Sequence, residues 1–151
     1  MESRYNAYIK NELYRAYALQ LVRLELRSIS SPRTVPSIHQ SIFEYVTSTK
    51  NRRSYGLLCV LAAMEKEPIS PSDIAKLLGV SRNSVDTMIS ETKSHGWIVC
   101  SRSKRGIRSI EAAPIMIDCW VGYAEWVSKN VKDIGISNVE AAVKMISMTT
   151  K

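Results

Sequence analysis

Residues 70–81 read Ser-Pro-Ser-Asp-Ile-Ala-Lys-Leu-Leu-Gly-Val-Ser, and this stretch decides the fold of the chain. Ser70 suits a helix N-cap, Pro71 suits the first helical position, and Asp73 completes a Ser-x-x-Asp capping pattern. Gly79 can take the left-handed backbone conformation that commonly ends a helix. The stretch therefore predicts a short helix that begins after Ser70 and ends at Gly79.

A second helix is predicted directly after the first. Ser81 is its expected N-cap, and the residues of its inner face recur every three or four positions from Val85 to Thr92. His95 and Gly96 end the helix. Its other face is polar and consists of Arg82, Asn83, Asp86, Ser90 and Lys93.

Small and apolar residues are spaced across the two helices as a helix-turn-helix requires. Ala75 must be small because the second helix crosses over it, and Gly79 must accept a positive φ in the turn. Val85 and Met88 fill the space between the helices. Other helical hairpins can contain the same residues, so the helix-turn-helix interpretation also depends on the segment that follows.

That segment predicts a β-hairpin. Residues 97–100 form a short apolar strand, residues 101–106 a polar and basic tip, and residues 107–110 a return strand. The order helix, helix, strand, basic loop, strand is that of a winged helix-turn-helix. The expected fold class is therefore mainly α with a small β-hairpin.

The region from about residue 55 to residue 126 resembles the winged-helix transcriptional regulators of the MarR type. The resemblance rests on the apolar helix before the motif, on residues 70–81, on His-Gly-Trp-Ile at residues 95–98 and on the long helix after the wing. Members of that family usually carry an acidic residue closely followed by Arg at the wing, whereas residues 103–108 read Ser-Lys-Arg-Gly-Ile-Arg. The resemblance implies a DNA-binding regulator, with a pocket for a small-molecule effector between the dimer helices and the winged domain.

Amphipathic helices flank the winged region. Apolar residues recur at helical spacing from Tyr5 to Leu26, and Pro114 opens a long helix that breaks near Gly135, with a last short helix from Asn138. These helices carry more apolar and aromatic surface than a winged domain of about 70 residues needs, so we expect them to interlock in a homodimer. The alternative is a monomer in which both helices fold back on their own domain. The residues expected at the dimer contact are Tyr5, Tyr8, Ile9, Leu13, Tyr17, Trp120, Tyr123 and Trp126.

The length of the chain predicts one domain over residues 1–151. Within it, residues 55–112 form the winged helix-turn-helix core, and residues 1–30 and 114–151 supply the dimerisation helices. A further helix is predicted between Pro36 and about Thr49. Residues 55–64 are almost wholly apolar, so we expect them to form a helix buried on all sides.

The charge of the chain favours a polyanionic partner, since 21 Lys and Arg residues against 14 Asp and Glu residues give a net charge of +7. Six of these cations and only two anions lie between Ser81 and Ile110. We expect sequence-specific binding to double-stranded DNA, with residues 81–95 in the major groove and residues 101–108 on the backbone or in the minor groove; a solvated basic loop is the alternative. The residues expected to contact DNA are Ser81, Arg82, Asn83, Ser84, Asp86, Thr87, Ser90, Lys93, Arg102, Lys104, Arg105 and Arg108.

The sequence gives little support to an enzyme. Its histidines are His39 and His95, with no Cys or Asp at ligand spacing and no glycine-rich phosphate loop, so no catalytic residue, cofactor or metal is expected. Cys59, Cys100 and Cys119 are expected to be small core residues in a reducing cytoplasm rather than ligands of a metal-sensing regulator. Two alternatives stay open: a winged-helix protein adaptor, and the DNA-binding part of a plasmid or phage replication or partition system.

Residues 1–6 are polar and charged, without the apolar region of an export signal behind them. No stretch approaches the roughly 18 apolar residues of a spanning helix. We therefore expect a cytoplasmic protein, associated with the nucleoid if bacterial, that does not contact a membrane.

Overall fold

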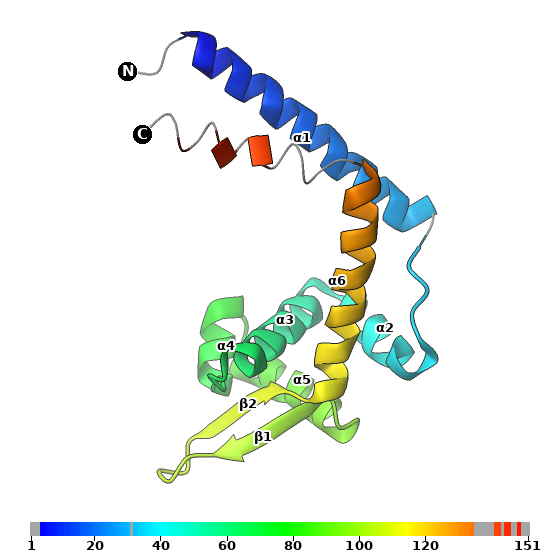
Figure 1. Cartoon of the computed structure of the whole chain (residues 1–151). Coiled ribbons are helices and arrows are strands. Elements are labelled where there is room, and N and C mark those ends of the chain that lie inside the picture. Colours follow the sequence, from blue (N-terminus) through cyan, green and yellow to red (C-terminus); the bar gives the residue numbers. More distant parts are fainter. Residues whose placement is uncertain (1–3, 31, 135–140, 143, 146–147, 149–151) are drawn as a thin grey trace. The chain divides into compact units, whose positions relative to one another are not determined.

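The computed structural model describes residues 4–30, 32–134, 141–142, 144–145 and 148 (Figure 1). The chain divides into two compact units: a terminal unit, Met1–Thr34 with Tyr123–Lys151, and a winged unit, Val35–Gly122. The last helix expected from Asn138 lies largely outside the described residues. The elements, in chain order, are α1 (Arg4–Ser30), a 3-10 helix η1 (Ser37–His39), α2 (Gln40–Ser48), α3 (Lys50–Glu65), α4 (Pro71–Leu78), α5 (Arg82–Ser94), β1 (Ile98–Arg102), β2 (Arg108–Ala112) and α6 (Pro114–Ile134).

The helix-turn-helix of the winged unit is formed by α4 and α5, and it begins and ends as the sequence predicts. The Ser70 hydroxyl accepts a hydrogen bond from the Asp73 N–H at 3.1 Å, and the Ser81 hydroxyl accepts one from the Ser84 N–H at 3.1 Å. Gly79 ends α4 with φ of 65°. The two N-caps and the glycine turn together fix the direction of α5.

The β-hairpin is antiparallel and pairs Ile98 with Ala112 and Arg102 with Arg108. It is longer than predicted, because β2 continues past Ile110 so that Ala112 also packs inward. Ile69 adds a short third pairing: its N–H donates to the Ile110 carbonyl at 2.9 Å and its carbonyl accepts from the Ile110 N–H at 2.8 Å. This bridge ties the start of α4 to the wing.

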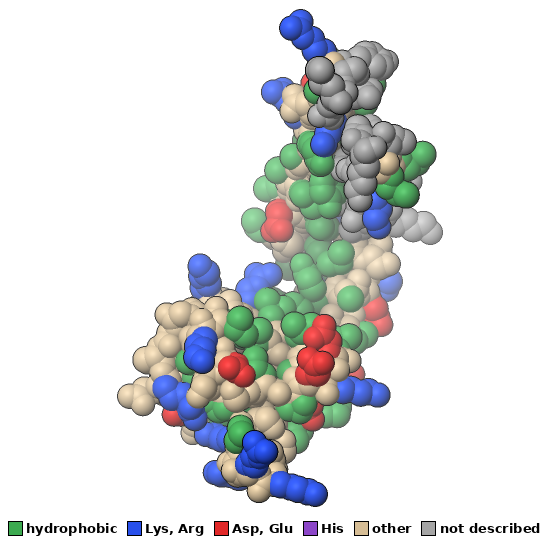
Figure 2. Space-filling model, turned by 90° about the vertical axis from the view of Figure 1, so that its left-hand side faces the viewer, with side chains coloured by type: hydrophobic (Ala, Val, Ile, Leu, Met, Phe, Trp, Pro, Cys, Tyr) green, Lys and Arg blue, Asp and Glu red, His purple; other side chains and the backbone are tan. Residues whose placement is uncertain are grey.

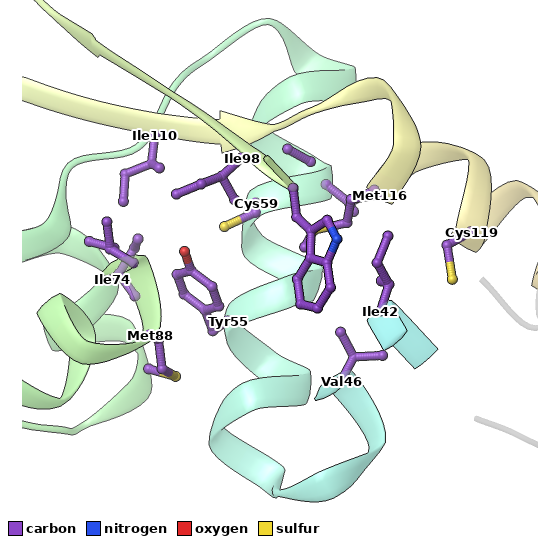
Figure 3. Close-up of a cluster of buried hydrophobic side chains, with 14 of the residues drawn as sticks. Ile42, Val46, Tyr55, Cys59, Ile74, Met88, Ile98, Ile110, Met116 and Cys119 are labelled. Carbon is purple, nitrogen blue, oxygen red and sulfur yellow. The ribbon is translucent and has the colours of Figure 1, made fainter. Parts of the chain in front are cut away.

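The core of the winged unit surrounds α3 (Figure 3). Tyr55 and Cys59 of α3 are fully buried, and Ile42, Val46 and Met116 from α2 and α6 pack in the same cluster. The Tyr55 hydroxyl lies 2.8 Å from the Thr92 hydroxyl of α5, which joins α3 to the helix-turn-helix by a buried hydrogen bond. Burial raises the pKa of Tyr55 well above its ordinary value, so the phenol stays neutral.

The expectation that residues 55–64 are buried on all sides is wrong for one side of the helix. Leu57, Leu61 and Met64 are exposed, whereas Tyr55 and Cys59 face the core. α3 also begins earlier than the apolar run, at Lys50, because the Thr49 hydroxyl caps it by accepting from the Arg52 N–H at 3.1 Å. The longer helix is therefore amphipathic, with one apolar side left in solvent.

The terminal unit contains α1 and the later part of α6. Arg27 Nη1 of α1 donates to Asn130 Oδ1 of α6 at 3.3 Å. The rings of Tyr123 and Trp126 stack within α6, with centroids 6.3 Å apart and planes 14° from parallel. Among the described residues, no helix combines the length and the apolarity that crossing a bilayer requires.

Candidate nucleic-acid interface

The polar face of α5 is open to solvent, and among the contact residues predicted on this helix only Asp86 is half-buried. Val85, Met88, Ile89 and Thr92 are buried against the core. The opposite side chains are exposed: Ser81, Arg82, Asn83, Ser84, Thr87, Ser90 and Lys93. The helix thus presents donors and acceptors outward from a rigidly packed inner face, which is the arrangement that reading base edges requires.

Asp86 lies at the centre of an ionic network on this face. Its carboxylate lies 3.3 Å from Arg82 Nε one turn earlier in α5 and 3.7 Å from Arg108 Nη1 of β2. Arg82 also donates through Nη1 to the Ser72 hydroxyl of α4 at 2.8 Å. The carboxylate is 44% exposed, so each of these ion pairs contributes only about 0–1 kcal/mol to stability. Their effect is to orient the two guanidinium groups.

A cationic pocket lies between the end of α5 and the hairpin. Its volume is about 530 Å³, and Lys93, Arg102 and Arg108 line it together with Cys100 and Ser101. None of these lining residues is acidic. Three cations around one open pocket repel one another, so an anion that enters it gains attraction from all three.

The tip of the hairpin carries the remaining predicted wing cations. Gly106, with φ of 76°, closes the turn by donating its N–H to the Ser103 carbonyl at 2.8 Å. Lys104 and Arg105 are exposed on this turn. Figure 2 shows Lys and Arg side chains projecting at this end of the winged unit.

Three residues that support α5 escaped the sequence analysis. The Glu91 carboxylate of α5 accepts from Arg52 Nη2 at 3.2 Å and from the Tyr45 hydroxyl at 2.7 Å. The Arg52 guanidinium also lies 4.7 Å from the centre of the Tyr45 ring. Burial, and then the hydrogen bond to Glu91, raises the pKa of Tyr45 above its ordinary value. Ser72, whose hydroxyl accepts a hydrogen bond from Arg82, is the third. Arg52 lies in a polar run, residues 48–54, and such a run by itself indicates only a turn or a helix boundary.

The residues predicted at a dimer contact fall in both units. Tyr8 is exposed and Ile9, Leu13 and Tyr17 are half-buried on α1, while the Tyr5 side chain lies outside the described part of the structure. Trp120, in the winged unit, and Trp126, in the terminal unit, are half-buried on α6, where Tyr123 is exposed. A second apolar row on α1 is also exposed and consists of Leu19, Val22, Leu26 and Ile29.

The cysteines and histidines do not gather into a metal site. Cys59 and Cys119 are buried, and Cys100 is a half-buried residue of β1. Within the described ranges, no three His, Cys, Asp or Glu side chains are placed to hold a metal ion together. His95 instead stacks on Trp97, with ring centroids 4.4 Å apart, at the end of α5.

Comparison with known proteins finds solved structures with a similar fold. Neither a family model nor a curated protein sequence matches the chain. Among solved structures, MepR of Staphylococcus aureus, a transcription regulator of the multidrug efflux pump MepA, is 14% identical and matches 89% of this chain and 95% of its own with a TM-score of 0.51. A point variant of S. aureus MepR is 10% identical and matches 89% of this chain and 97% of its own with a TM-score of 0.53. At these identities the likeness shows the fold alone, and the winged helix-turn-helix fold that the sequence predicts is confirmed.

Proposed function

We propose that this protein binds double-stranded DNA sequence-specifically and regulates transcription. One observation carries the proposal: the exposed polar face of α5 adjoins the pocket formed by Lys93, Arg102 and Arg108. A helix with outward polar side chains fits the major groove of DNA, and the cationic wing beside it is complementary in charge to the flanking phosphates. The fold shared with MepR, a transcription regulator, supports the same function.

Base reading falls to the amino-terminal half of α5. Arg82 suits the O6 and N7 acceptors of guanine, and Asn83 suits the N6 donor and N7 acceptor of adenine. Before it contacts a base, Arg82 must leave Asp86 and Ser72. Because the ion pair is exposed, this release costs little, and the network holds the guanidinium near its working position until DNA arrives.

Phosphate binding falls to the wing and to the end of α5. A backbone phosphate in the pocket would contact Lys93, Arg102 and Arg108, and Lys104 and Arg105 would follow the backbone or enter the minor groove. These contacts are independent of sequence and release counterions, so they make affinity strongly dependent on salt.

The functional unit we propose is a homodimer. The exposed row on α1 that includes Val22 and Leu26 would be buried against a second copy, together with aromatic residues of α6. A two-fold axis would then place two α5 helices about 34 Å apart, and the pair would read a near-palindromic site. Burial of this row explains why large apolar side chains are arranged at helical spacing on a solvent-facing side.

A salt titration tests the DNA-binding proposal. Wild-type protein is titrated into a fluorescent random-sequence duplex at several salt concentrations, beside a wing variant (Arg102→Ala, Lys104→Ala, Arg105→Ala) and a control, Lys129→Ala, in the terminal unit. We expect a log–log salt slope of several units for wild type and for the control, with each phosphate contact contributing about 0.9, and a smaller slope for the wing variant. No binding by wild type at about 50 mM salt would refute the proposal.

A further inference from the structure

A groove lies between α3 and α4 in the winged unit, and DNA binding as proposed does not use it. Its volume is about 290 Å³. Leu58 and Leu61 of α3 and Leu77 of α4 form apolar parts of its lining. All three belong to helices packed on the core, so the shape of the groove is set by the fold itself.

The apolar surface extends beyond the groove along α3. Leu61 is 50% exposed and Leu77 is 66% exposed, although both are large apolar residues. On the same helix, Leu57 is 43% exposed one turn before Leu61, and Met64 is 65% exposed one turn after it. Single exposed apolar residues are ordinary, but a contiguous row of this kind marks an interaction surface.

Three carboxylates line the groove itself. Glu65, Glu67 and Asp73 line the groove, and no Lys or Arg is among its lining residues. Figure 2 shows acidic side chains beside hydrophobic ones on this face of the winged unit. In a chain of net charge +7, such a group is a local reversal of sign.

Helix stability explains only one of the three carboxylates. Asp73 lies in the first turn of α4, where a negative charge favours the helix dipole. Glu65 is the last residue of α3 and Glu67 follows shortly after it, where a negative charge is unfavourable. These two charges therefore do not stabilise α3, but they would attract a cation that approaches the groove.

We propose that this groove binds a basic amphipathic helix of a partner protein. Apolar side chains on one face of that helix would cover Leu61 and Leu77, and its Lys or Arg side chains would pair with Glu65, Glu67 and Asp73. The carboxylates repel DNA and acidic helices, so the sign of the charge selects the occupant. Through this surface the protein would contact another protein while α5 is bound to DNA.

The test uses the full-length protein and a fluorescent amphipathic peptide of Leu and Lys, about five helical turns long. A peptide with Glu in place of Lys is the charge control. We expect the basic peptide to bind and the acidic one not to bind, although the protein as a whole is cationic. The double variant Glu65→Lys, Glu67→Lys should weaken peptide binding at least about tenfold, and Leu77→Ser about fivefold. Glu44→Lys and Ile38→Ser, exposed elsewhere in the winged unit, should leave it unchanged.

Three results would overturn the proposal: equal binding of both peptides, no binding of the basic peptide, or binding that the groove variants do not weaken. A change in the sedimentation mass of the Leu77→Ser variant would also overturn it, because the groove would then be covered by a second copy of the chain. DNA binding by Leu77→Ser is measured in parallel and should match wild type. The two measurements therefore distinguish a wild-type protein that does not bind DNA from one whose groove does not bind the basic peptide.

Discussion

Arg108 Nη1 of β2 lies 3.7 Å from Asp86 Oδ1 of α5, so the wing and α5 share an ion pair. The same carboxylate oxygen accepts from Arg82 Nε at 3.3 Å. The wing sequence itself has no acidic residue between Ser101 and Ile110, in contrast to the family it resembles. Asp86 supplies a carboxylate to the wing arginine from the neighbouring helix.

Asp86 should therefore limit non-specific binding. Replacing it by Asn removes the carboxylate that pairs with Arg82 and Arg108, and in the proposed complex it removes a negative charge close to the DNA. We expect Asp86→Asn to raise affinity for random-sequence duplex about three- to tenfold and to lower the ratio of specific to non-specific affinity. Asp118→Asn, an exposed site on α6 with the same change of charge, is the control. Equal effects of the two variants would show that only net charge matters.

The hydrogen bond between Tyr55 and Thr92 should contribute to stability without affecting DNA contacts. Tyr55→Phe keeps the packing of the ring but removes the hydroxyl, while Thr92 keeps its bond to the Met88 carbonyl at 2.8 Å. We expect the free energy of unfolding to fall by about 1 kcal/mol, measured by urea denaturation. Tyr14→Phe, at an exposed tyrosine outside the predicted dimer contact, should change nothing. An unchanged stability for Tyr55→Phe would contradict the buried bond.

Alkaline pH should destabilise the protein through Cys59. Burial raises the pKa of its thiol from 9.0 to about 12. Between these values the unfolded chain loses the proton and the folded chain keeps it, so stability is unaffected below pH 9 and falls as pH rises through this window. From pH 8 to pH 9.5 the free energy of unfolding should drop by about 1 kcal/mol from this group. Urea denaturation at both pH values should show a smaller drop for Cys59→Ala, and an equal drop would argue against the assignment.

The exposed row of α1 should hold the dimer together. The double variant Val22→Lys, Leu26→Lys places like charges at the proposed contact, so we expect sedimentation at the monomer mass and affinity for a palindromic duplex at least about tenfold lower. Ser28→Lys lies on another side of α1 and should remain dimeric. Wild-type protein that sediments as a monomer at micromolar concentration would refute the dimer.

Local signals in the sequence predicted the helix-turn-helix well. The N-caps Ser70 and Ser81 and the turn at Gly79 depend on residues within one or two turns, which sequence patterns record directly. Non-local contacts were missed. The Ile69 bridge to Ile110 involves a single residue, too short for a strand pattern, and the pair of Arg52 with Glu91 joins residues far apart in the chain.

The exposed side of α3 was missed for a different reason. The run from Tyr55 to Met64 is apolar at nearly every position, so its composition holds no record of which side packs. The packing of β2, α2 and α4 against α3 decides that Tyr55 and Cys59 face inward and Leu57 and Leu61 outward. The same limit applies to Asp86, whose place on the polar face was predicted but whose pairing with Arg108 depends on the hairpin.

Selection of binding sites from a random duplex library tests sequence-specific reading by α5 most directly. Wild-type protein and the double variant Arg82→Ala, Asn83→Ala are carried through the same rounds of selection. The structure predicts that wild type enriches a near-palindromic sequence and that the variant, although it still binds DNA through the wing, loses or changes that sequence. No enrichment by wild type, or an identical sequence selected by both proteins, would contradict base reading by α5.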